Sequence, residues 1–364
     1  MTMGNKNENE TLLFDVSKFE ENRIHWGREF PKFENEDLRP SKTAIINFAT
    51  ELDYYSFLDS NNLQKSGSSY WLPTQSKASV SGLYWIGGAR KTKYPIYIIS
   101  KGRFKKTLTA DALEWAGMEY KIVVEPQEFD EYAKKIPDEK IIKLPFSNLG
   151  LGSIPARNFV FEHSLNLGHK KHWILDDNIK GFYFFNHNLK IKVKDATPFV
   201  AVENMSDKFL NAHICGMQYD FFILRKNGSI PPYCVNKRVY SCILIDNSIP
   251  HRWRGRYNED TDLCLRVLKS GACTILVNAF CCGKQETMSM SGGNTDDLYK
   301  IDGGRQEMTN HLIAQHPDCV GAHQRWGRVT HKVDYSAWAD NDLVKNDSYT
   351  PQVIESLNLF REGK

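Results

Sequence analysis

The sequence predicts an α/β protein whose main sheet is parallel and Rossmann-like. From residue 94 onwards, runs rich in β-branched and aromatic residues alternate with segments of helical periodicity. The expected strands are 94–100, 120–124, 140–144 and 172–175, and the expected helices are 107–118, 126–136 and 153–167. Strands that alternate with helices of this length need crossover connections, which make neighbouring strands parallel.

Each of these elements has a local signal of its own. The first strand, Tyr94–Ser100, contains three isoleucines and two tyrosines, residues that favour strands. The first helix ends near Gly117 and the third near Gly168, since glycine readily takes the conformation that stops a helix. Pro126 opens the second helix, because proline fits the first helical turn.

Size and composition indicate a globular intracellular protein. The 364 residues, 41% of them hydrophobic, can bury one sizeable core and a smaller second unit. No run approaches the roughly 20 apolar residues of a membrane span, and Met1–Glu10 lacks the apolar stretch of a signal peptide. The eight cysteines form no CxxC pair, which favours buried free thiols in a reducing compartment.

We expect a small unit in front of the main domain. A strand-like run at 43–49 and a helix-like run at 50–58 predict a small α/β module. The next stretch is rich in Ser, Gly, Lys and Arg, as linkers are. The expected parts are a flexible tail (1–22), the N-terminal α/β module (23–75), a linker (76–93), the main domain (94–338) and a C-terminal extension (339–364).

Polar clusters follow three of the four predicted strands. They are Ser100-Lys101-Gly102-Arg103 after the first strand, Glu125 after the second and Asp176-Asp177-Asn178 after the fourth. Open α/β sheets bind ligands at the carboxyl ends of their strands. We therefore expect these side chains to meet in one binding site.

The turn Asp176-Asp177-Asn178 supplies two carboxylates and an amide directly after a buried strand. Hard divalent cations such as Mg²⁺ and Mn²⁺ prefer oxygen ligands, and a bound nucleotide diphosphate needs such a cation. The alternative interpretation is an Asx-type turn or a helix cap, which uses the same residue types. The sequence context favours the metal site.

That context begins with a glycine-rich loop, Gly150–Asn158, which opens the helix in front of the acidic turn. A helix N-terminus attracts phosphate, and Arg157 in the first turn adds a formal positive charge. An ordinary capped helix start would explain Ser153 and Pro155 but not the arginine.

A second acidic motif, Arg256–Asp262, precedes an amphipathic helix. Acids in a first helical turn usually interact only with the helix dipole, and this interpretation is favoured for Asp262. Glu259 and Asp260 lie at the edge between loop and helix. There a carboxylate could act as a general base towards a hydroxyl group.

Basic residues are concentrated between Phe221 and Arg256. Seven of them stand against one acid, Asp246, which gives this segment a charge of seven minus one, or +6. The seven are Arg225, Lys226, Lys237, Arg238, Arg252, Arg254 and Arg256. The segment is interpreted either as a solvated face with ligands for phosphates or as a nucleic-acid surface.

Taken in order, the alternating strands, the acidic turn and the later Asn-Glu-Asp motif resemble glycosyltransferases of the GT-A fold. The similarity covers roughly 94–338 and implies a Rossmann-like fold with a mixed central sheet. Within that fold, 94–103, 156–158 and 175–179 are similar to phage glycosyltransferases associated with TET-type oxygenases. The stretch 26–73 also resembles a small module recurrent in phage proteins.

The resemblance implies a role for each motif. Glu259 or Asp260 would be the catalytic base, and Gly216 and Met217 would line the acceptor pocket. A UDP-sugar donor and Mn²⁺ or Mg²⁺ would be bound by the remaining clusters. Ser100, Lys101 and Arg103 would lie at the uridine or ribose, Glu125 at the base, Arg157 at the diphosphate, Asp176 at the ribose or the metal, and Asp177 and Asn178 at the metal.

The resemblance also implies a substrate and a setting. The sugar would be transferred, with inversion, to the hydroxymethyl group of a modified pyrimidine in double-stranded DNA, with 5-hydroxymethylcytosine favoured. The protein would act in the cytoplasm of an infected bacterial host, without a membrane partner. A polysaccharide or protein acceptor is the alternative, and a non-catalytic binding module with a degenerate fold is a third hypothesis.

Overall fold

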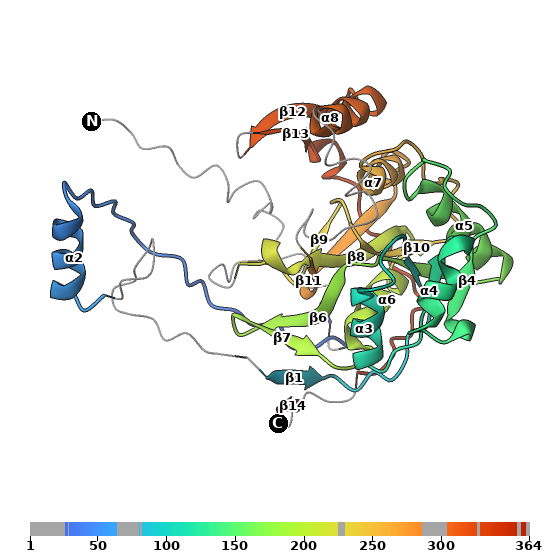
Figure 1. Cartoon of the computed structure of the whole chain (residues 1–364), viewed down its shortest axis with the longest axis horizontal. Coiled ribbons are helices and arrows are strands. Elements are labelled where there is room, and N and C mark those ends of the chain that lie inside the picture. The colour runs from blue at the N-terminus through green and yellow to red at the C-terminus, as the bar shows by residue number, and fades with distance from the viewer. Residues whose placement is uncertain are drawn as a thin grey trace.

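The computed structural model describes residues 26–27, 29–63, 80, 82–224, 230–285, 304–325, 328–354 and 358–361. The tail expected at 1–22 lies outside these residues, as do parts of the expected module and linker. Figure 1 shows a large sheet flanked by helices, and one helix, α2 (Glu51–Ser60), that stands apart from it.

Twelve strands of the described residues form one large sheet. They are β1 (Leu83–Ile86), β2 (Ile96–Ile99), β3 (Lys121–Val124), β4 (Ile141–Lys143), β5 (Lys171–Asp176), β6 (Ile179–Asn186), β7 (Leu189–Val193), β8 (Ala212–Tyr219), β9 (Tyr233–Val235), β10 (Cys242–Asp246), β11 (Cys273–Lys284) and β14 (Asn358–Arg361). Their order is β14-β1-β7-β6-β11-β8-β10-β5-β2-β3-β4, and β9 pairs with β11 beside this path.

Helices connect and cover these strands. The α-helices are α3 (Leu108–Trp115), α4 (Phe129–Ala133), α5 (Ile154–Asn166), α6 (Thr197–Asp207), α7 (Glu259–Lys269) and α8 (Gly304–Gln315). Short 3₁₀ turns are η2 (Pro126–Glu128), η3 (Asp138–Lys140), η4 (Asp220–Phe222) and η6 (Ser336–Trp338). A separate antiparallel pair, β12 (Val320–Arg325) and β13 (Arg328–Val333), packs against α8. No helix within the described ranges is both long and apolar enough to cross a membrane.

The parallel part of the sheet agrees with the sequence prediction. β4, β3, β2 and β5 are neighbours in that order and are all parallel. All four residues of β2 are buried, as expected for a strand covered on both faces. Gly117 (φ 66°) and Gly168 (φ 74°) take the left-handed conformation just after α3 and α5.

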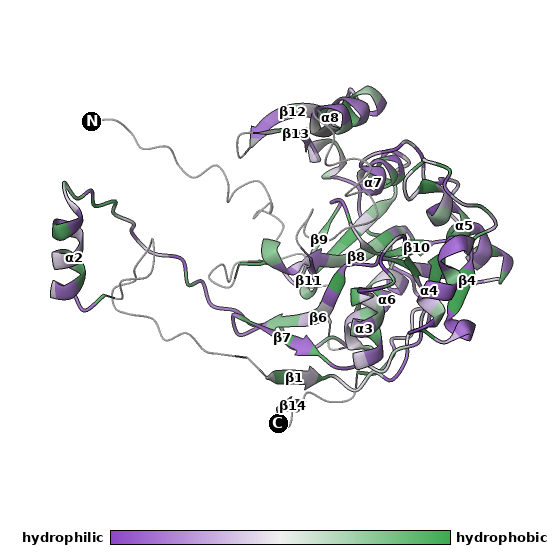
Figure 2. Cartoon of the chain, in the orientation of Figure 1, coloured by the Kyte–Doolittle hydropathy of each residue, from purple (hydrophilic) through white to green (hydrophobic). Residues whose placement is uncertain are grey.

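The remaining part of the sheet is mixed. β11 lies in its middle, parallel to β8 and antiparallel to β6 and β9. All of its 12 residues except Lys284 are buried, and Figure 2 shows that the strands at the centre of the sheet are largely hydrophobic. The prediction of an α/β fold with a mixed central sheet is therefore confirmed.

The N-terminal module differs from the prediction in one element. The predicted helix is present as α2, and it begins after Thr50, which forms a reciprocal capping box with Asp53. The strand predicted at 43–49 is absent: these residues have no strand partner, and the side chain of Ile45 is 86% exposed. β-Branched residues favour a strand only where a neighbouring strand offers a surface to pack on.

The stretch predicted as a linker contributes a strand to the sheet. β1, inside 76–93, pairs antiparallel with β14 and parallel with β7. Its Trp85 is buried and stacks on Phe184 with the ring centroids 4.7 Å apart. The linker prediction is wrong for Leu83–Ile86, because four apolar residues suffice for a strand where a sheet edge is available. The other domain boundaries stay predictions.

The interior of the sheet corrects one further prediction. Gly216 and Met217, expected to line the acceptor pocket, lie inside β8. A Cβ atom on Gly216 would come 2.3 Å from the carbonyl oxygen of Cys242, so glycine is needed for the close approach of β8 and β10. Met217 is 1% exposed. Both residues therefore serve packing. The eight cysteines are all buried and free, as predicted.

Candidate active site

One cavity of about 840 Å³ lies at the carboxyl ends of β2, β3 and β5, and the starts of α5 and α7 and the end of β11 complete its wall. Its volume is within the range of roughly 300–1,000 Å³ typical of ligand pockets. Ten of the twelve residues assigned to the site from the sequence line it, although their roles stay predictions. They are Ser100, Lys101, Arg103, Glu125, Arg157, Asp176, Asp177, Asn178, Glu259 and Asp260.

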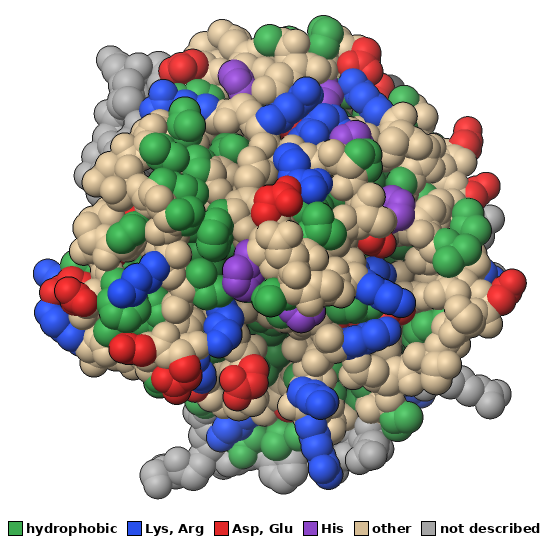
Figure 3. Space-filling model, turned by 90° about the vertical axis from the view of Figure 1, so that its right-hand side faces the viewer, with side chains coloured by type: hydrophobic (Ala, Val, Ile, Leu, Met, Phe, Trp, Pro, Cys, Tyr) green, Lys and Arg blue, Asp and Glu red, His purple; other side chains and the backbone are tan. Residues whose placement is uncertain are grey.

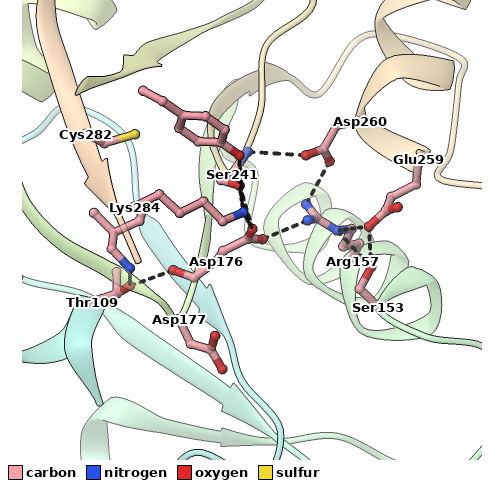
Figure 4. A network of polar contacts seen from close by, with 12 residues as sticks. Thr109, Ser153, Arg157, Asp176, Asp177, Ser241, Glu259, Asp260, Cys282 and Lys284 are labelled. Carbon is pink, nitrogen blue, oxygen red and sulfur yellow. Dashed lines mark hydrogen bonds and ion pairs between the residues drawn. The ribbon is translucent and has the colours of Figure 1, made fainter. Parts of the chain in front are cut away.

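Asp176, the last residue of β5, is held by three side chains (Figure 4). Its Oδ1 accepts a hydrogen bond from Arg157 Nη2 at 2.9 Å. Its Oδ2 accepts from Ser241 Oγ at 2.5 Å and from Lys284 Nζ at 2.9 Å. Burial acts to raise the pKa of Asp176, but Lys284 and Arg157 outweigh it and hold that pKa well below its ordinary value. Asp176 is therefore a carboxylate bound to two cations.

Lys284 and Ser241 are site residues that the sequence analysis does not identify. Lys284 Nζ also contacts Ser241 Oγ at 2.6 Å and the hydroxyl of Tyr219 at 3.2 Å. Ser241 has a φ of 54°, a left-handed conformation that is rare for serine and is concentrated at functional sites. One signal was available: Lys284 is the first charged residue after the run 273–283, where a strand would end.

Asp177 lies on the other side of the acidic turn. Its Oδ2 accepts a hydrogen bond from Ser100 Oγ at 2.7 Å, and its Oδ1 is paired with Arg103. Ser100 Oγ is also 2.6 Å from the hydroxyl of Tyr132. Burial raises the pKa of Asp177, and the nearby Arg103 opposes that shift. Ser100 and Arg103 therefore reach the acidic turn directly, as a shared binding site requires.

Glu125 follows β3 and is fixed by a small network. Lys101 Nζ donates to its Oε1 at 3.0 Å, while Gln127 Nε2 and the backbone N–H of Asn148 donate to its Oε2 at 2.6 and 3.1 Å. Burial acts to raise the pKa of Glu125, but the hydrogen bonds from Gln127 and Lys101 prevail and lower it. Glu125 thus stays charged and rigid at the edge of the cavity.

Arg157 lies at the centre of the site, with its side chain 3% exposed. Besides Asp176, its guanidinium faces Glu259 and Asp260, each at 3.5 Å. It also lies over the ring of Trp253, with Cζ 4.5 Å from the ring centroid. One buried cation therefore links the acidic turn after β5 to the two acids that begin α7, as Figure 4 shows.

Glu259 and Asp260 differ in what their oxygens contact. Glu259 Oε1 accepts a hydrogen bond from Ser153 Oγ at 2.7 Å. Asp260 Oδ2 accepts from the backbone N–H of Ser241 at 3.2 Å, but its Oδ1 is buried without a hydrogen-bond partner. Burial, the first cause, raises the pKa of Asp260 to about 7, with Glu259 adding to the shift and Arg157 opposing it. Asp260 is the better proton acceptor of the two.

The residue in front of these acids has a left-handed backbone conformation. Asn258, immediately before α7, has a φ of 55°, and its side-chain amide donates to the carbonyl oxygen of Met308 at 3.0 Å. Asparagine adopts this left-handed conformation more readily than most residues, so the sequence fits the turn that precedes Glu259 and Asp260.

The model of the TET-Associated Glycosyltransferase family matches residues 94–293, more than half of the chain. The chain belongs to this family. The match spans β2 to β11 and includes all twelve residues that were assigned to the site from the sequence. The expectation of a glycosyltransferase with the GT-A type of α/β fold is thereby confirmed.

Other comparisons add little to the family assignment. A solved structure assigned as a nucleotide-diphospho-sugar transferase from Desulfovibrio desulfuricans G20 shares 10% identity with this glycosyltransferase. The match covers 48% of this chain and 77% of that one at a TM-score of 0.27, which is too low to support any statement. No curated protein matches the sequence.

The contacts of the acidic turn do not fit a divalent cation as they stand. All four carboxylate oxygens of Asp176 and Asp177 already accept from side-chain donors, and three of those donors are cationic. Within the turn, Asn178 Oδ1 is the one side-chain oxygen that is buried without a hydrogen-bond partner. A divalent ion about 4 Å from a lysine ammonium would be repelled by about 8 kcal/mol at an effective dielectric constant of about 20. Metal binding here would require Lys284 to move away.

A different group has the residue types of a metal site. Ligand atoms of His316, Asp318 and Cys319 lie within 4.8 Å of one another, the only such group among the described residues. Asp318 is paired with Lys269 at 2.7 Å, and His316 Nε2 is 2.9 Å from Asp262. None of the three lines the cavity. This group therefore does not supply the donor site with a cation.

The basic segment Phe221–Arg256 is only partly available to a ligand. Arg252 pairs with Glu162 at 2.6 Å, and Arg254 pairs with the buried Asp262 at 3.0 Å. Arg225 and Lys226 lie outside the described residues, and Arg256 lines the cavity. On the face that Figure 3 draws, Lys and Arg side chains form separate groups rather than one continuous band.

Proposed function

We propose that this glycosyltransferase moves a sugar from a UDP-sugar to the hydroxymethyl group of a modified pyrimidine in double-stranded DNA, 5-hydroxymethylcytosine being favoured. The observation that carries the proposal is the arrangement of Asp260 and Arg157, a base and a cation in one cavity. The base has a pKa raised to about 7, near the pH at which general bases work best. The cation supplies a site for a diphosphate.

The reaction is a single displacement with inversion at the anomeric carbon. The acceptor hydroxyl loses its proton to Asp260 Oδ1, which faces Arg157 Nη1 at 3.5 Å but accepts no hydrogen bond. The new bond joins the acceptor oxygen to the anomeric carbon. The bond from that carbon to the β-phosphate oxygen breaks, and its electron pair leaves with UDP, whose charge Arg157 offsets.

On the donor side, the strand-end clusters hold the nucleotide. Ser100 and Arg103 lie at the uridine or ribose, and Glu125, which stays charged, lies near the base. Lys101 fixes Glu125 in place at 3.0 Å. Asp176 ends β5 and accepts a hydrogen bond from Arg157, and of the two roles predicted for it, ribose or metal, the proposal assigns it the ribose.

On the acceptor side, aromatic rings line the cavity beside Asp260, the proposed catalytic base. Phe221, 52% exposed, lies 5.2 Å from the ring of Tyr219, which stacks on Tyr240 at 5.5 Å with an interplanar angle of 10°. All three line the cavity. Aromatic side chains of this kind stack bases taken out of a duplex, and an enzyme acting on a base inside DNA must extrude it.

The role of Mn²⁺ or Mg²⁺ at Asp176, Asp177 and Asn178 stays a prediction of the sequence. The hydrogen bonds that the carboxylates of Asp176 and Asp177 already accept argue against a metal ion at this turn. No step of the proposed transfer is assigned to a metal.

A glycosyltransferase acting on a polysaccharide or a protein is the alternative, and one observation favours it. The pairing of Arg252 and Arg254 with acids reduces the positive charge that DNA phosphates would contact. This alternative keeps every donor-side assignment and changes only the acceptor.

The test is to incubate the protein with DNA containing 5-hydroxymethylcytosine and a panel of UDP-sugars, then to weigh the released nucleosides. We expect one donor to add the mass of one sugar to the modified nucleoside. DNA of the same sequence with unmodified cytosine, and with 5-hydroxymethyluracil, serves as control. If UDP is released at the same rate with and without every DNA, the DNA acceptor is wrong and the alternative gains support.

A further inference from the structure

Lys284 occupies the position at which a cation would contact the acidic turn. It is the last residue of β11, and its side chain is 19% exposed. Its ammonium touches three oxygens, those of Asp176, Ser241 and Tyr219, at 2.9, 2.6 and 3.2 Å. A buried ammonium is stable only when it is paired in this way. The fold therefore holds a fixed positive charge at the mouth of the donor site.

Arg157 binds the other oxygen of the same carboxylate, so Asp176 is held between two cations. Arg103 pairs with Asp177 beside them. Arg157 also faces Glu259 and Asp260, each at 3.5 Å, so its charge is shared among three acids. Among the described residues Lys284, by contrast, forms an ion pair with Asp176 alone. Of the two cations that bind Asp176, Lys284 is therefore the one whose charge is less shared.

We infer that Lys284 takes the place of a divalent cation, so that this enzyme binds the diphosphate of its donor without a metal. The inference rests on the proposed nucleotide-diphosphate donor but not on the acceptor. The longest of the three contacts, to the neutral hydroxyl of Tyr219, is the one that a phosphate oxygen replaces. Tyr219 retains a partner then, because its hydroxyl is 2.6 Å from Ser241 Oγ.

Lys284 then contributes to the transfer through charge alone. When the bond between the anomeric carbon and the β-phosphate oxygen breaks, the electron pair stays on that oxygen. The ammonium of Lys284 and the guanidinium of Arg157 lie on the two sides of Asp176 and stabilise this oxyanion. No proton leaves Lys284, whose pKa burial acts to lower but the carboxylate of Asp176 raises.

The first test measures UDP binding to the full-length protein by calorimetry, once in EDTA and once in Mn²⁺ or Mg²⁺. We expect dissociation constants that agree within about twofold. A loss of affinity of tenfold or more in EDTA, restored by the metal, would overturn the inference. Mn²⁺ titrated alone and followed by electron paramagnetic resonance should show no stoichiometric site at the acidic turn.

The second test replaces the charge. Lys284→Met should weaken UDP binding in EDTA by about 10- to 100-fold, the effect of losing a charge-assisted contact. Lys284→Arg should retain metal-free binding. Lys269→Met is the matched control, since Lys269 also pairs with an aspartate, at 2.7 Å, but lies outside the cavity. Unchanged affinity in Lys284→Met would overturn the inference.

These outcomes can be separated from a failure of the proposed function. UDP binding requires no DNA, so a wrong acceptor leaves both tests intact. If Lys284→Met does not fold, as judged by circular dichroism, the UDP affinities of the unmodified protein in EDTA and in metal still test the inference. If UDP does not bind under any condition, the nucleotide donor itself is wrong.

Discussion

The two walls of the cavity differ in how their residues reach it. On the donor wall, each cluster directly follows its own strand of the parallel part: Ser100 follows β2, Glu125 follows β3 and Asp176 ends β5. On the second wall, Ser241 precedes β10 and Lys284 ends β11, and both contact Asp176 from elements that are far away along the chain. Because strands and helices alternate regularly in the parallel part, the residues of the donor wall could be predicted from the sequence. The second wall depends on the pairing of strands that are far apart in the sequence.

The two walls also differ in which of their side-chain atoms are available to a ligand. Both carboxylate oxygens of Asp176, Asp177 and Glu125 on the donor wall accept hydrogen bonds, whereas on the second wall Asp260 Oδ1 accepts none and Phe221 has an exposed ring. Arg157 touches both walls. Substitutions at Asp260 and Phe221 should therefore change turnover and acceptor binding, those at Lys284 should change donor binding, and those at Arg157 should affect the whole site.

The largest effect is expected for Asp260→Asn. An amide cannot take the acceptor proton, so kcat should fall by about 10²- to 10⁴-fold, while the dissociation constant of UDP changes little. The measurement is turnover at saturating donor, with UDP binding in parallel. Glu259→Gln is the matched control, because Glu259 already accepts from Ser153, and its kcat should fall far less. Equal losses in the two variants would assign the base to neither residue.

The next effect is on stability. Arg157→Met removes the cation that faces three buried or half-buried acids, and leaving such charges unpaired should cost about 3–5 kcal/mol of the free energy of unfolding. Urea denaturation measures it.

Arg252→Met provides the comparison. Its ion pair with Glu162 has side chains 34% and 52% exposed, so the expected loss is about 1 kcal/mol or less. A similar loss in both variants would contradict the central role of Arg157.

A smaller effect is expected for Phe221→Ala. Loss of base stacking of about 1–3 kcal/mol should raise the KM for modified DNA by about 5- to 150-fold and leave the KM for the donor unchanged. Leu224→Ala is the control, since Leu224 is 42% exposed on the same segment but does not line the cavity. An increase in the donor KM instead would place Phe221 on the donor wall.

The last prediction concerns the response to pH. Below the pKa of about 7 of Asp260, kcat/KM should fall tenfold per pH unit, because the base is protonated. Stability has the opposite sign. The folded chain binds this proton more tightly than the unfolded chain, so the contribution of Asp260 is complete below about pH 4 and is lost as the pH rises through 7.

Glu203 shares the raised pKa of about 7 but lies in α6 outside the cavity. It affects the pH dependence of stability and not that of activity. A pH–rate profile that is flat between 5 and 8 would contradict the role of Asp260.

The sequence allowed the donor wall to be predicted because each of its residues has a local cause. A strand signal followed by a polar residue is enough where parallel strands share one edge. Lys284 could not be assigned in the same way, since nothing near it in the sequence reveals that β11 ends beside Asp176. The role predicted for Gly216 was wrong for the same reason, because its neighbour across the sheet, Cys242, is distant in sequence.

The errors in the N-terminal part have another cause. The run 43–49 has strand-forming residues but no partner, and Leu83–Ile86 forms a strand in a polar stretch because β7 and β14 are available on either side. Whether a segment forms a strand depends on whether another strand lies beside it, and the pattern of a single sequence does not show which strands will be neighbours.

The pairing of β1 with β14 has a practical consequence for handling the protein. A shortened chain ending at 338, the expected end of the main domain, would lack Asn358–Arg361 and leave one side of Leu83–Ile86 without hydrogen-bond partners. An uncovered strand of this kind, with Leu, Tyr, Trp and Ile in succession, attracts strands of other molecules. Such a truncation should therefore aggregate on concentration, and crystallisation or assay samples should retain the last residues.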